Sequence, residues 1–277
     1  MPAKPAAAFL DFATLGPGID TSRLEWLLEL RYFDYTSRDE VDERLRGAKV
    51  ALVNKAKIDR ASIEAADALE LIVLAATGSD NVDTAAAKEA GIGVANVRDY
   101  CSDAVAQHVF ALILGLTQGI GIYAANVRAG AWVKSKSFAL FDHPIRELSG
   151  LKLGLIGYGS LGQAVARAGE CFGMQIMISM RPGTSGPPPE GRVELERVLT
   201  EADVLSLHCP LNDATRHLID ADALRRMKND AIVINTARGG LIDSEALAEA
   251  LRSGQIAGAG IDVLPVEPPP ADDPLLA

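Results

Sequence analysis

The chain has 277 residues, of which 48% are hydrophobic and 23% charged, and its formal net charge is −10 at pH 7. These values describe a globular protein long enough for two domains of ordinary size. The negative charge argues against a general surface for nucleic acid or for an anionic membrane, so we expect neither as a partner. No apolar run approaches the roughly 20 residues that span a bilayer, and the start of the chain does not read as a signal peptide. We therefore expect a cytoplasmic protein.

The three cysteines, Cys101, Cys171 and Cys209, lie far apart and form no Cys-x-x-Cys pair. This spacing indicates neither a disulfide framework nor a zinc site, and we predict no bound metal. We interpret all three cysteines as small core residues in a reducing compartment.

Short apolar runs alternate with helical or turn segments in the first hundred residues. Strands are predicted at 7–11, 49–54, 71–75 and 92–95, and helices at 21–30, 60–68 and 84–90. Asp59 and Asp83 are placed as N-caps of the last two helices. Alternation of strand and helix predicts a parallel, doubly wound sheet, here without a glycine fingerprint.

Residues 102–125 carry a long helical pattern that is apolar on all sides, as in a helix buried between domains or between subunits. The next stretch, 129–150, has little periodicity but contains Trp132, Phe138 and Phe141. So much apolar surface in irregular chain predicts an arm that packs against a second subunit.

A glycine-rich turn, Gly157-Tyr158-Gly159-Ser160-Leu161-Gly162, is the strongest local signal. An apolar strand-like run at 151–156 precedes it, and alanine and valine follow at helical spacing over 163–172. Gly157 permits a tight turn, Gly159 lets the backbone approach a pyrophosphate, and Gly162 lets the helix pack on the strand. The helix N-terminus offers N–H donors to the phosphates. The context therefore predicts a dinucleotide-binding turn.

The remaining segments continue the alternation of strand and helix. Strands are predicted at 174–179, 203–208, 231–235 and 257–262, and helices near 221–226 and 244–252. Proline and glycine dominate between Arg181 and Arg192, which marks a loop at the outer rim of the dinucleotide site. The fold class that follows is α/β, with two doubly wound parallel-sheet (Rossmann-like) domains and a cleft between them.

Several motifs occur in a fixed order: GSDNVD at 78–83, the glycine turn, LHCPL at 207–211, NTARGG at 235–240, and GIDV at 260–263 followed by Glu267-Pro268. Together they resemble the D-isomer-specific 2-hydroxyacid dehydrogenase family along nearly the whole chain. The linker DHPIREL at 142–148 and its surroundings look most like the glycerate dehydrogenase, or hydroxypyruvate reductase, branch.

This resemblance implies a division of the chain at residue 100. Residues 1–100 would form a flavodoxin-like substrate domain, normally completed by a C-terminal segment that is missing here. Residues 101–277 would form the NAD(P)-binding Rossmann domain, including an interdomain helix and a dimerisation arm. The implied partners are a small 2-keto or 2-hydroxy acid and a second copy of the chain in a homodimer.

The resemblance also implies hydride transfer between a nicotinamide and hydroxypyruvate/D-glycerate or glyoxylate/glycolate. Arg238 matches the family's catalytic arginine, whose planar fork can hold a carboxylate and polarise the keto oxygen. Glu267 matches the acid that hydrogen-bonds a catalytic histidine and keeps it protonated. Structural alternatives stay open, namely a salt bridge at a helix start for Arg238 and a solvated loop carboxylate for Glu267.

Gly78 and Ser79 match the family's loop whose N–H groups receive the substrate carboxylate, while Asn54 and Lys55 lie on a loop facing the cleft. Ordinary turns are the alternative for both pairs. Asp262 matches the acid near the nicotinamide carboxamide. The full set of expected cofactor-binding residues is Val105, Gly157, Tyr158, Gly159, Ser160, Leu161, Gly162, Met180, Arg181, His208, Cys209, Pro210, Thr215, Thr236, Ala237, Arg238 and Asp262.

Preference between the two nicotinamide cofactors depends on the end of the second strand of the dinucleotide-binding unit. An NAD site places Asp or Glu there, about 20 residues beyond the glycines, to bind the ribose 2′-OH. This chain has Ser179-Met180-Arg181-Pro182 instead. No carboxylate repels a 2′-phosphate and Arg181 can pair with one, so we predict NAD(P)H as cofactor, with NADP(H) tolerated or mildly preferred. The alternative is a solvated Arg181 with NAD(H) bound through its other groups.

The family's acid/base histidine lies beyond the position of Glu267, and the sequence ends at Ala277 before reaching it. We therefore expect a fragment of an otherwise competent dehydrogenase, or a sequence that omits its disordered tail. As written, the chain should bind cofactor yet reduce substrate poorly. Of the four histidines, His108 and His208 are interpreted as packing or cofactor-loop residues, and His143 and His217 as exposed.

Two other functions fit the same motifs. A non-enzymatic, dinucleotide-sensing corepressor of this fold would keep the glycine turn and the arginine while losing the proton donor. Alternatively, the chain could be another enzyme of the superfamily, such as a glyoxylate, phosphoglycerate or formate dehydrogenase. A phosphorylated substrate would require further cations in the first domain, for which Lys55, Lys57 and Arg98 are candidates.

Overall fold

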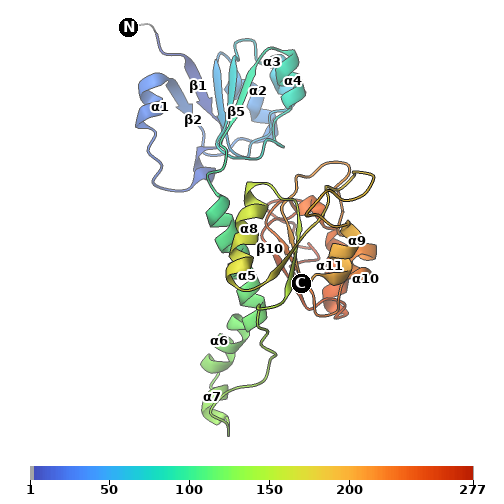
Figure 1. The fold of residues 1–277 in the computed structure, drawn as a ribbon. Coiled ribbons are helices and arrows are strands. Elements are labelled where there is room, and N and C mark those ends of the chain that lie inside the picture. Colours follow the sequence, from blue (N-terminus) through green and yellow to red (C-terminus); the bar gives the residue numbers. More distant parts are fainter. Residues whose placement is uncertain (1–2, 277) are drawn as a thin grey trace. The chain divides into compact units, whose positions relative to one another are not determined.

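The computed structural model describes residues 3–276 and divides into two compact units, with the division between Tyr100 and Cys101. Each unit contains one five-stranded sheet whose neighbouring strands all pair in parallel (Figure 1). The second sheet is parallel throughout as well. The predicted α/β, doubly wound fold class is therefore confirmed.

Unit 1 has the strand order β2-β1-β3-β4-β5. Its strands are β1 (Ala6–Phe9), β2 (Glu29–Tyr32), β3 (Val50–Val53), β4 (Leu71–Leu74) and β5 (Gly93–Asn96). Its helices are α1 (Ser22–Leu27), α2 (Val41–Leu45), α3 (Arg60–Ala65) and α4 (Thr84–Glu89), with 3₁₀ turns at Phe12–Leu15 and Arg38–Glu40. Alternate residues of each strand face opposite sides: Ala8, Leu10 and Ala51 pack with α2, α3 and α4, whereas Phe9 and Leu52 pack on the α1 side.

The predicted helix over 21–30 is wrong at its end. Helix α1 stops at Leu27, and Glu29–Tyr32 form the edge strand β2 beside β1. Leu28 has an extended backbone, with φ −126° and ψ 152°, and both Leu28 and Leu30 pack on the Phe9 side of the sheet. This short period-two alternation was masked by the helical pattern before it.

The two predicted N-caps in unit 1 are confirmed. The Asp59 carboxylate accepts the backbone N–H of Ser62 at 3.1 Å, and the Asp83 carboxylate accepts that of Ala86 at 2.8 Å. Each side chain thereby satisfies an N–H that has no partner within its helix.

Unit 2 has the strand order β10-β9-β8-β6-β7. Its strands are β6 (Lys152–Ile156), β7 (Gln175–Ile178), β8 (Val204–Leu207), β9 (Ile232–Asn235) and β10 (Gly258–Ile261). Its helices are α5 (Ser102–Gln118), α6 (Ile120–Arg128), α7 (Ala131–Lys134), α8 (Ser160–Cys171), α9 (Leu195–Glu201), α10 (Ala221–Arg226) and α11 (Ser244–Arg252). Helix α9 was not predicted.

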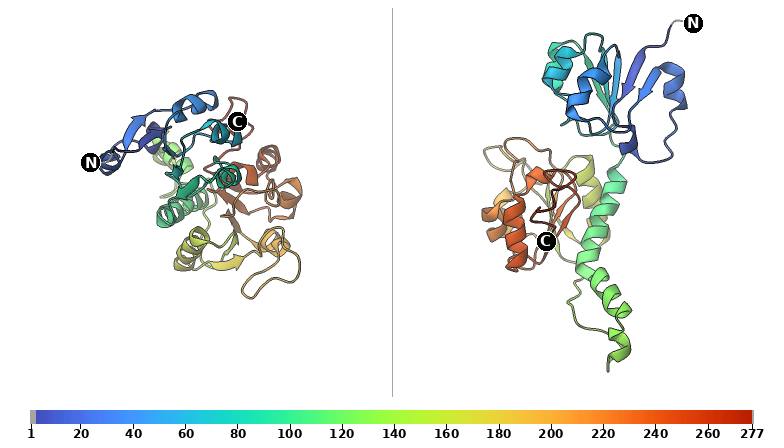
Figure 2. Two further views of the ribbon diagram at one scale, coloured as in Figure 1. Left: turned by 90° about the horizontal axis from the view of Figure 1, so that it is seen from above. Right: turned by 180° about the vertical axis from the view of Figure 1, so that it is seen from behind.

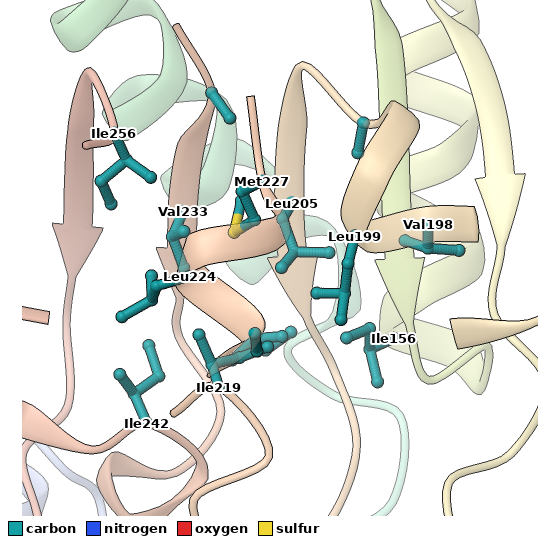
Figure 3. Packing of buried hydrophobic residues seen from close by; sticks show 14 of the residues in the cluster. Ile156, Val198, Leu199, Leu205, Ile219, Leu224, Met227, Val233, Ile242 and Ile256 are labelled. Carbon is teal, nitrogen blue, oxygen red and sulfur yellow. The ribbon is translucent and has the colours of Figure 1, made fainter. Parts of the chain in front are cut away.

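Two helical layers sandwich the sheet of unit 2 (Figure 2). Leu153 and Leu155 of β6 join the cluster under α5 and α8. Leu205 of β8 and Val233 of β9 belong to the opposite cluster, with residues of α9, α10 and α11 (Figure 3). Because strand side chains alternate between faces, strands buried on both sides must be apolar throughout, which is why these segments were predictable.

The predicted helix over 102–125 is interrupted. Gly119 has left-handed φ and ψ of 60° and 31°, which ends α5 and starts α6. Among the described residues, no single helix is long and apolar enough to cross a membrane; α5 and α6 meet that criterion only as a pair, bent by 55°.

The segment after α6 keeps its apolar side chains on the surface. Trp132, Phe138 and Phe141 are 54%, 87% and 75% exposed. Tyr123 of α6 donates its hydroxyl to the carbonyl of His143 at 2.8 Å, and its ring contacts the imidazole edge-on. His143 is therefore half-buried, so its predicted exposure is wrong, whereas the His217 side chain is 50% exposed as predicted.

Asp203 anchors the end of the segment that follows α6 to the sheet of unit 2. Its buried carboxylate accepts the N–H of Lys152 at 2.7 Å, the Lys228 ammonium at 2.8 Å and the Arg146 guanidinium at 3.0 Å. Burial by itself raises the pKa of Asp203, but these donors outweigh it and lower the pKa. A paired, hydrogen-bonded carboxylate thus fixes the point where the chain returns to β6.

The interpretation of the cysteines as core residues is only partly correct. Cys209 is buried and Cys101 is half-buried, but Cys171 is exposed at the end of α8. The buried face of α8 includes Ala166 and Gly169, and Cys171 lies off that stripe.

Candidate active site

The carboxyl ends of parallel strands lie on one edge of their sheet, and four predicted motifs of unit 2 follow such ends. These are the glycine turn after β6, His208 after β8, the NTARGG segment after β9 and Asp262 after β10. The strand order changes direction at β6, because β7 lies on one side of β6 and β8 lies on the other. Ligands of open α/β sheets bind at such a switch point.

The glycine turn is packed tightly on one side and open on the other. Gly157 has a φ of +99°, and a Cβ there would lie 2.4 Å from the carbonyl oxygen of His208. A Cβ on Gly162 would lie 2.4 Å from the carbonyl oxygen of Gly157. By contrast, a Cβ on Gly159 would meet no atom within 4 Å. The backbone can therefore be approached closely at Gly159.

Helix α8 begins at this open point. Gly159 is its N-cap and has no side chain to bond the first turn. The first bond across the turn runs from the Gln163 N–H to the Gly159 carbonyl at 2.9 Å. The preceding N–H groups, of Ser160, Leu161 and Gly162, lie at the positive end of the helix dipole. This arrangement suits a phosphate group.

His208 faces the glycine turn from the neighbouring strand end. Its Nε2 lies 2.9 Å from the Ser206 hydroxyl, and its Nδ1 is buried without a hydrogen-bond partner among the described residues. Burial lowers the pKa of His208 to about 4, so the imidazole is neutral at pH 7. Burial also raises the pKa of the adjacent Cys209 thiol to about 11, so Cys209 stays protonated.

Thr236 and Thr215, both predicted to bind cofactor, differ in their contacts. The Thr236 hydroxyl is buried and has no partner among the described residues. The Thr215 hydroxyl donates to the Pro210 carbonyl at 2.7 Å and accepts the Asn212 N–H at 2.8 Å. The Thr215 hydroxyl thus stabilises the loop that contains it. The Thr236 hydroxyl and the His208 Nδ1 are instead available to hydrogen-bond a ligand.

Arg238 follows β9 and is half-buried. Its Nη1 donates a hydrogen bond to the Ala237 carbonyl at 2.7 Å. The loop that carries it is held by Asn235, which is 1% exposed. Asn235 accepts the Ala237 N–H at 3.0 Å and donates to the Arg238 carbonyl at 2.9 Å. Asn235 was not predicted as a site residue; an asparagine that ends a buried strand was the available signal.

The segment after β10 carries the two predicted acids. Asp262 lies 3.1 Å from Nε2 of His108 on α5, and each side chain is about half exposed. Glu267 is exposed, and its carboxylate accepts the N–H of Leu264, also on that segment, at 2.9 Å. Val105 lies on α5, one turn before His108, and packs on the cluster under α8.

The other predicted substrate residues belong to unit 1. Asn54 and Lys55 follow β3, and the buried Asp11 after β1 organises them. Its carboxylate accepts the N–H of Asn54 at 2.8 Å, that of Ala56 at 2.6 Å and that of Lys55. Asp11 was not predicted, although an acid directly after a buried strand was the signal for it.

The loop after β4 carries Gly78 and Ser79, both half-buried. The Ser79 carbonyl accepts the N–H of Val82 at 3.0 Å, so the segment forms a turn. At the rim of unit 2, Met180 is half-buried and Arg181 is exposed. Among the described residues, no group of three or more His, Cys, Asp or Glu side chains could hold a metal ion.

Comparison with known proteins relates these motifs to one family. Residues 110–277 match the family model of the D-isomer specific 2-hydroxyacid dehydrogenase NAD-binding domain. A glycerate dehydrogenase of Methylorubrum extorquens is 44% identical over 264 residues, which cover 94% of this chain and 81% of that protein. A hydroxypyruvate reductase of Blautia hydrogenotrophica is 35% identical over 96% of this chain and 85% of its own length.

Among solved structures, this chain is similar to an NADPH-dependent glyoxylate/hydroxypyruvate reductase of Sinorhizobium meliloti in complex with NADP and malonate. The two are 28% identical with a TM-score of 0.82, over 99% of this chain and 84% of that one.

The low pKa of His208 predicts acid sensitivity. The pKa falls from 6.5 to about 4 on folding, so between about pH 6.5 and pH 4 the unfolded state takes up the proton and the folded state does not. The free energy of unfolding should be unaffected above pH 6.5 and reduced by about 2 kcal/mol at pH ~5. Urea unfolding of the wild type and of His208→Gln at pH ~7.5 and pH ~5 measures this contribution. An equal pH-dependent loss in both proteins would contradict it.

Proposed function

Because the chain belongs to the D-isomer specific 2-hydroxyacid dehydrogenase family, we propose that it transfers a hydride between NAD(P) and a small 2-keto or 2-hydroxy acid. The observation that carries this proposal is the open backbone at Gly159, where α8 begins, on the same sheet edge as the half-buried Arg238. A nicotinamide cofactor supplies the hydride for reduction and accepts it for oxidation.

The residues at this edge fit such a cofactor. The N–H groups of the first turn of α8 would bind its pyrophosphate over Gly159. The Thr236 hydroxyl and the His208 Nδ1, both buried without a described partner, provide polar groups for the rest of the molecule. His208 is neutral, so it donates or accepts hydrogen bonds without adding charge.

Arg238 is the proposed catalytic cation. Its guanidinium would hold the substrate carboxylate and polarise the keto oxygen, stabilising the alkoxide that develops as hydride arrives. Asn235 hydrogen-bonds the backbone of Ala237 and of Arg238, so the loop that carries the cation is held in place before substrate binds. On unit 1, the backbone N–H groups of Gly78 and Ser79 are proposed to bind the carboxylate, and Asn54 and Lys55 to contact the substrate. Glu267 remains a candidate catalytic residue.

The names of the relatives support hydroxypyruvate and glyoxylate as substrates to test first. Oxidation of NADPH and NADH by the full-length protein should be followed with hydroxypyruvate, glyoxylate, pyruvate and 3-phosphohydroxypyruvate. We expect turnover of at least one of the first two. A protein that binds NADPH yet turns over none of the four would favour the dinucleotide-sensing alternative.

Replacing Arg238 tests the proposed reaction directly. Arg238→Gln should lower kcat/KM for the preferred keto acid by roughly 10²–10³-fold, because it removes a charge that acts on the developing alkoxide. The Kd for NADPH should change by a smaller factor than kcat/KM, because the N–H groups of the first turn of α8 would still bind the pyrophosphate. Arg252→Gln is the matched control, since Arg252 is 61% exposed and paired with Glu249 on α11. Equal kcat/KM in wild type and Arg238→Gln would exclude this role.

Two glycine variants separate binding from folding. Gly159→Ala should leave the free energy of unfolding within about 1 kcal/mol, since its φ is −78° and its surroundings are open. It should raise the Kd for NADH and NADPH roughly tenfold or more, because the methyl group occupies the approach to the backbone. Gly157→Ala should instead destabilise the fold. Fluorescence titration and urea unfolding measure both, and unchanged cofactor affinity in Gly159→Ala would count against the proposed site.

A homodimer through the segment after α6 is the proposed assembly. Val133 is 92% exposed and Phe138 is 87% exposed, an apolar surface that a second copy could cover. Light scattering should give twice the chain mass of 29.3 kDa. A Trp132→Ser/Phe138→Ser variant should shift toward the mass of a single chain. A wild-type monomer at micromolar concentration would refute the dimer.

The cytoplasmic location stays a prediction.

For the cofactor, we propose that NADP(H) is accepted and mildly preferred. The end of β7 carries Ser179, Met180 and Arg181 and no carboxylate that would repel a 2′-phosphate. The similar reductase of known structure holds NADP, which is consistent with this proposal.

A further inference from the structure

A second arginine lies beside the glycine turn although it is distant in sequence. Arg192 follows the Pro- and Gly-rich loop, and its guanidinium carbon lies 5.8 Å from the centre of the Tyr158 ring. Its Nη1 donates to the Ser179 carbonyl at 3.0 Å. The side chain is therefore held between the second residue of the turn and the end of β7.

Backbone pairing brings Arg192 to this place. The Val193 N–H donates to the Ile178 carbonyl at 2.9 Å, and the Met180 N–H donates to the Val193 carbonyl at 2.8 Å. Ser179 and Val193 form an isolated parallel bridge. The chain directly after Arg192 is thus paired with the end of β7, while the Arg192 N–H donates to the Pro189 carbonyl of the loop at 3.0 Å.

The end of β7 carries positive charge, although the chain has a net charge of −10. Within residues 3–276, neither Arg181 nor Arg192 forms a salt bridge with a carboxylate, in contrast to Arg197 and Arg226 on the neighbouring helices. Two arginines without carboxylate partners therefore flank the end of β7. In a dinucleotide-binding unit this strand end lies next to the adenosine ribose, where its 2′ substituent is recognised.

We propose that Arg192, more than Arg181, binds the 2′-phosphate of NADP(H) and sets the preference over NAD(H); this rests on the proposed function. Arg192 is half-buried and held by Tyr158 and Ser179, whereas Arg181 is exposed. An arginine that is already ordered loses less side-chain entropy when it binds a phosphate. Its unused N–H groups can form charge-assisted bonds with the phosphate oxygens.

The same geometry permits a second role, which the test must separate. A flat guanidinium over Tyr158 could support the adenine ring by packing alone. Such packing would help NADP(H) and NAD(H) equally, because both cofactors carry the same adenine. The ratio of the two affinities therefore distinguishes phosphate binding from packing.

The experiment measures Kd values for NADPH, NADH, 2′,5′-ADP and 5′-AMP by calorimetry with the wild type, Arg192→Gln, Arg192→Lys and Arg181→Gln. Arg197→Gln is the control, since Arg197 is 60% exposed and paired with Glu201. Arg192→Gln should weaken NADPH and 2′,5′-ADP by roughly 10–100-fold, as loss of a charge-assisted pair does. NADH and 5′-AMP should change less than about twofold, Arg192→Lys should retain part of the affinity, and Arg181→Gln should have the smaller effect.

Four results would overturn the proposal. An equal loss for both cofactors in Arg192→Gln would assign the residue to packing. Unchanged NADPH affinity in that variant, or a strong NADH preference of the wild type, would remove the 2′-phosphate site while leaving the proposed dehydrogenase intact. A wild type that binds neither cofactor would instead refute the proposed function, and this inference with it. Unchanged NADH affinity also verifies that Arg192→Gln is folded.

Discussion

The contact between the Gly157 turn and the backbone of His208 determines the geometry of the candidate site. The ends of β6 and β8 approach so closely that no Cβ fits at Gly157. This packing directs the chain from β6 straight into α8, so the first turn of that helix lies at the sheet edge with Gly159 open. His208 lies at this contact, and burial of its imidazole lowers the pKa and keeps the ring neutral. An anion-binding helix terminus and a neutral, polar neighbour therefore follow from one close approach of two backbones.

The two units share a topology but differ at the place where ligands bind. In each sheet the first strand lies between the second and the third, so each has a switch point at its carboxyl edge. In unit 2 that point presents unfilled N–H groups of α8 near Gly159. In unit 1 the carboxylate of Asp11 occupies the equivalent place and accepts three successive backbone N–H groups. Unit 1 thus supplies its own anion at this place.

The sequence was most informative where local pattern and burial agree. The glycine turn, the strands buried on both faces and the aspartate caps each leave a signal within a few residues. Edge strand β2 was missed because four residues of alternating character follow a helix, and the interruption of 102–125 depends on the backbone conformation of a single residue, Gly119. A helical period alone does not reveal a break at one glycine.

Three positions that the structure places among the site residues were not predicted. Asp11 acts on residues of another loop, Asn235 acts on the backbone of the arginine loop, and Arg192 returns to β7 only after a long loop. Asp11 and Arg192 depend on contacts between segments that sequence spacing does not specify, whereas Asn235 bonds residues two and three positions further along its own segment. The sequence therefore identified Arg181, which directly follows the strand, and missed the arginine that the fold brings to the same place.

A crystal structure of this chain with bound NADP⁺ is the most direct test of the account. We predict pyrophosphate oxygens within hydrogen-bond distance of the N–H groups of Ser160 and Leu161, with the phosphate chain passing over Gly159. Density for the dinucleotide elsewhere on unit 2, or a side chain covering Gly159 while the cofactor is bound, would contradict it.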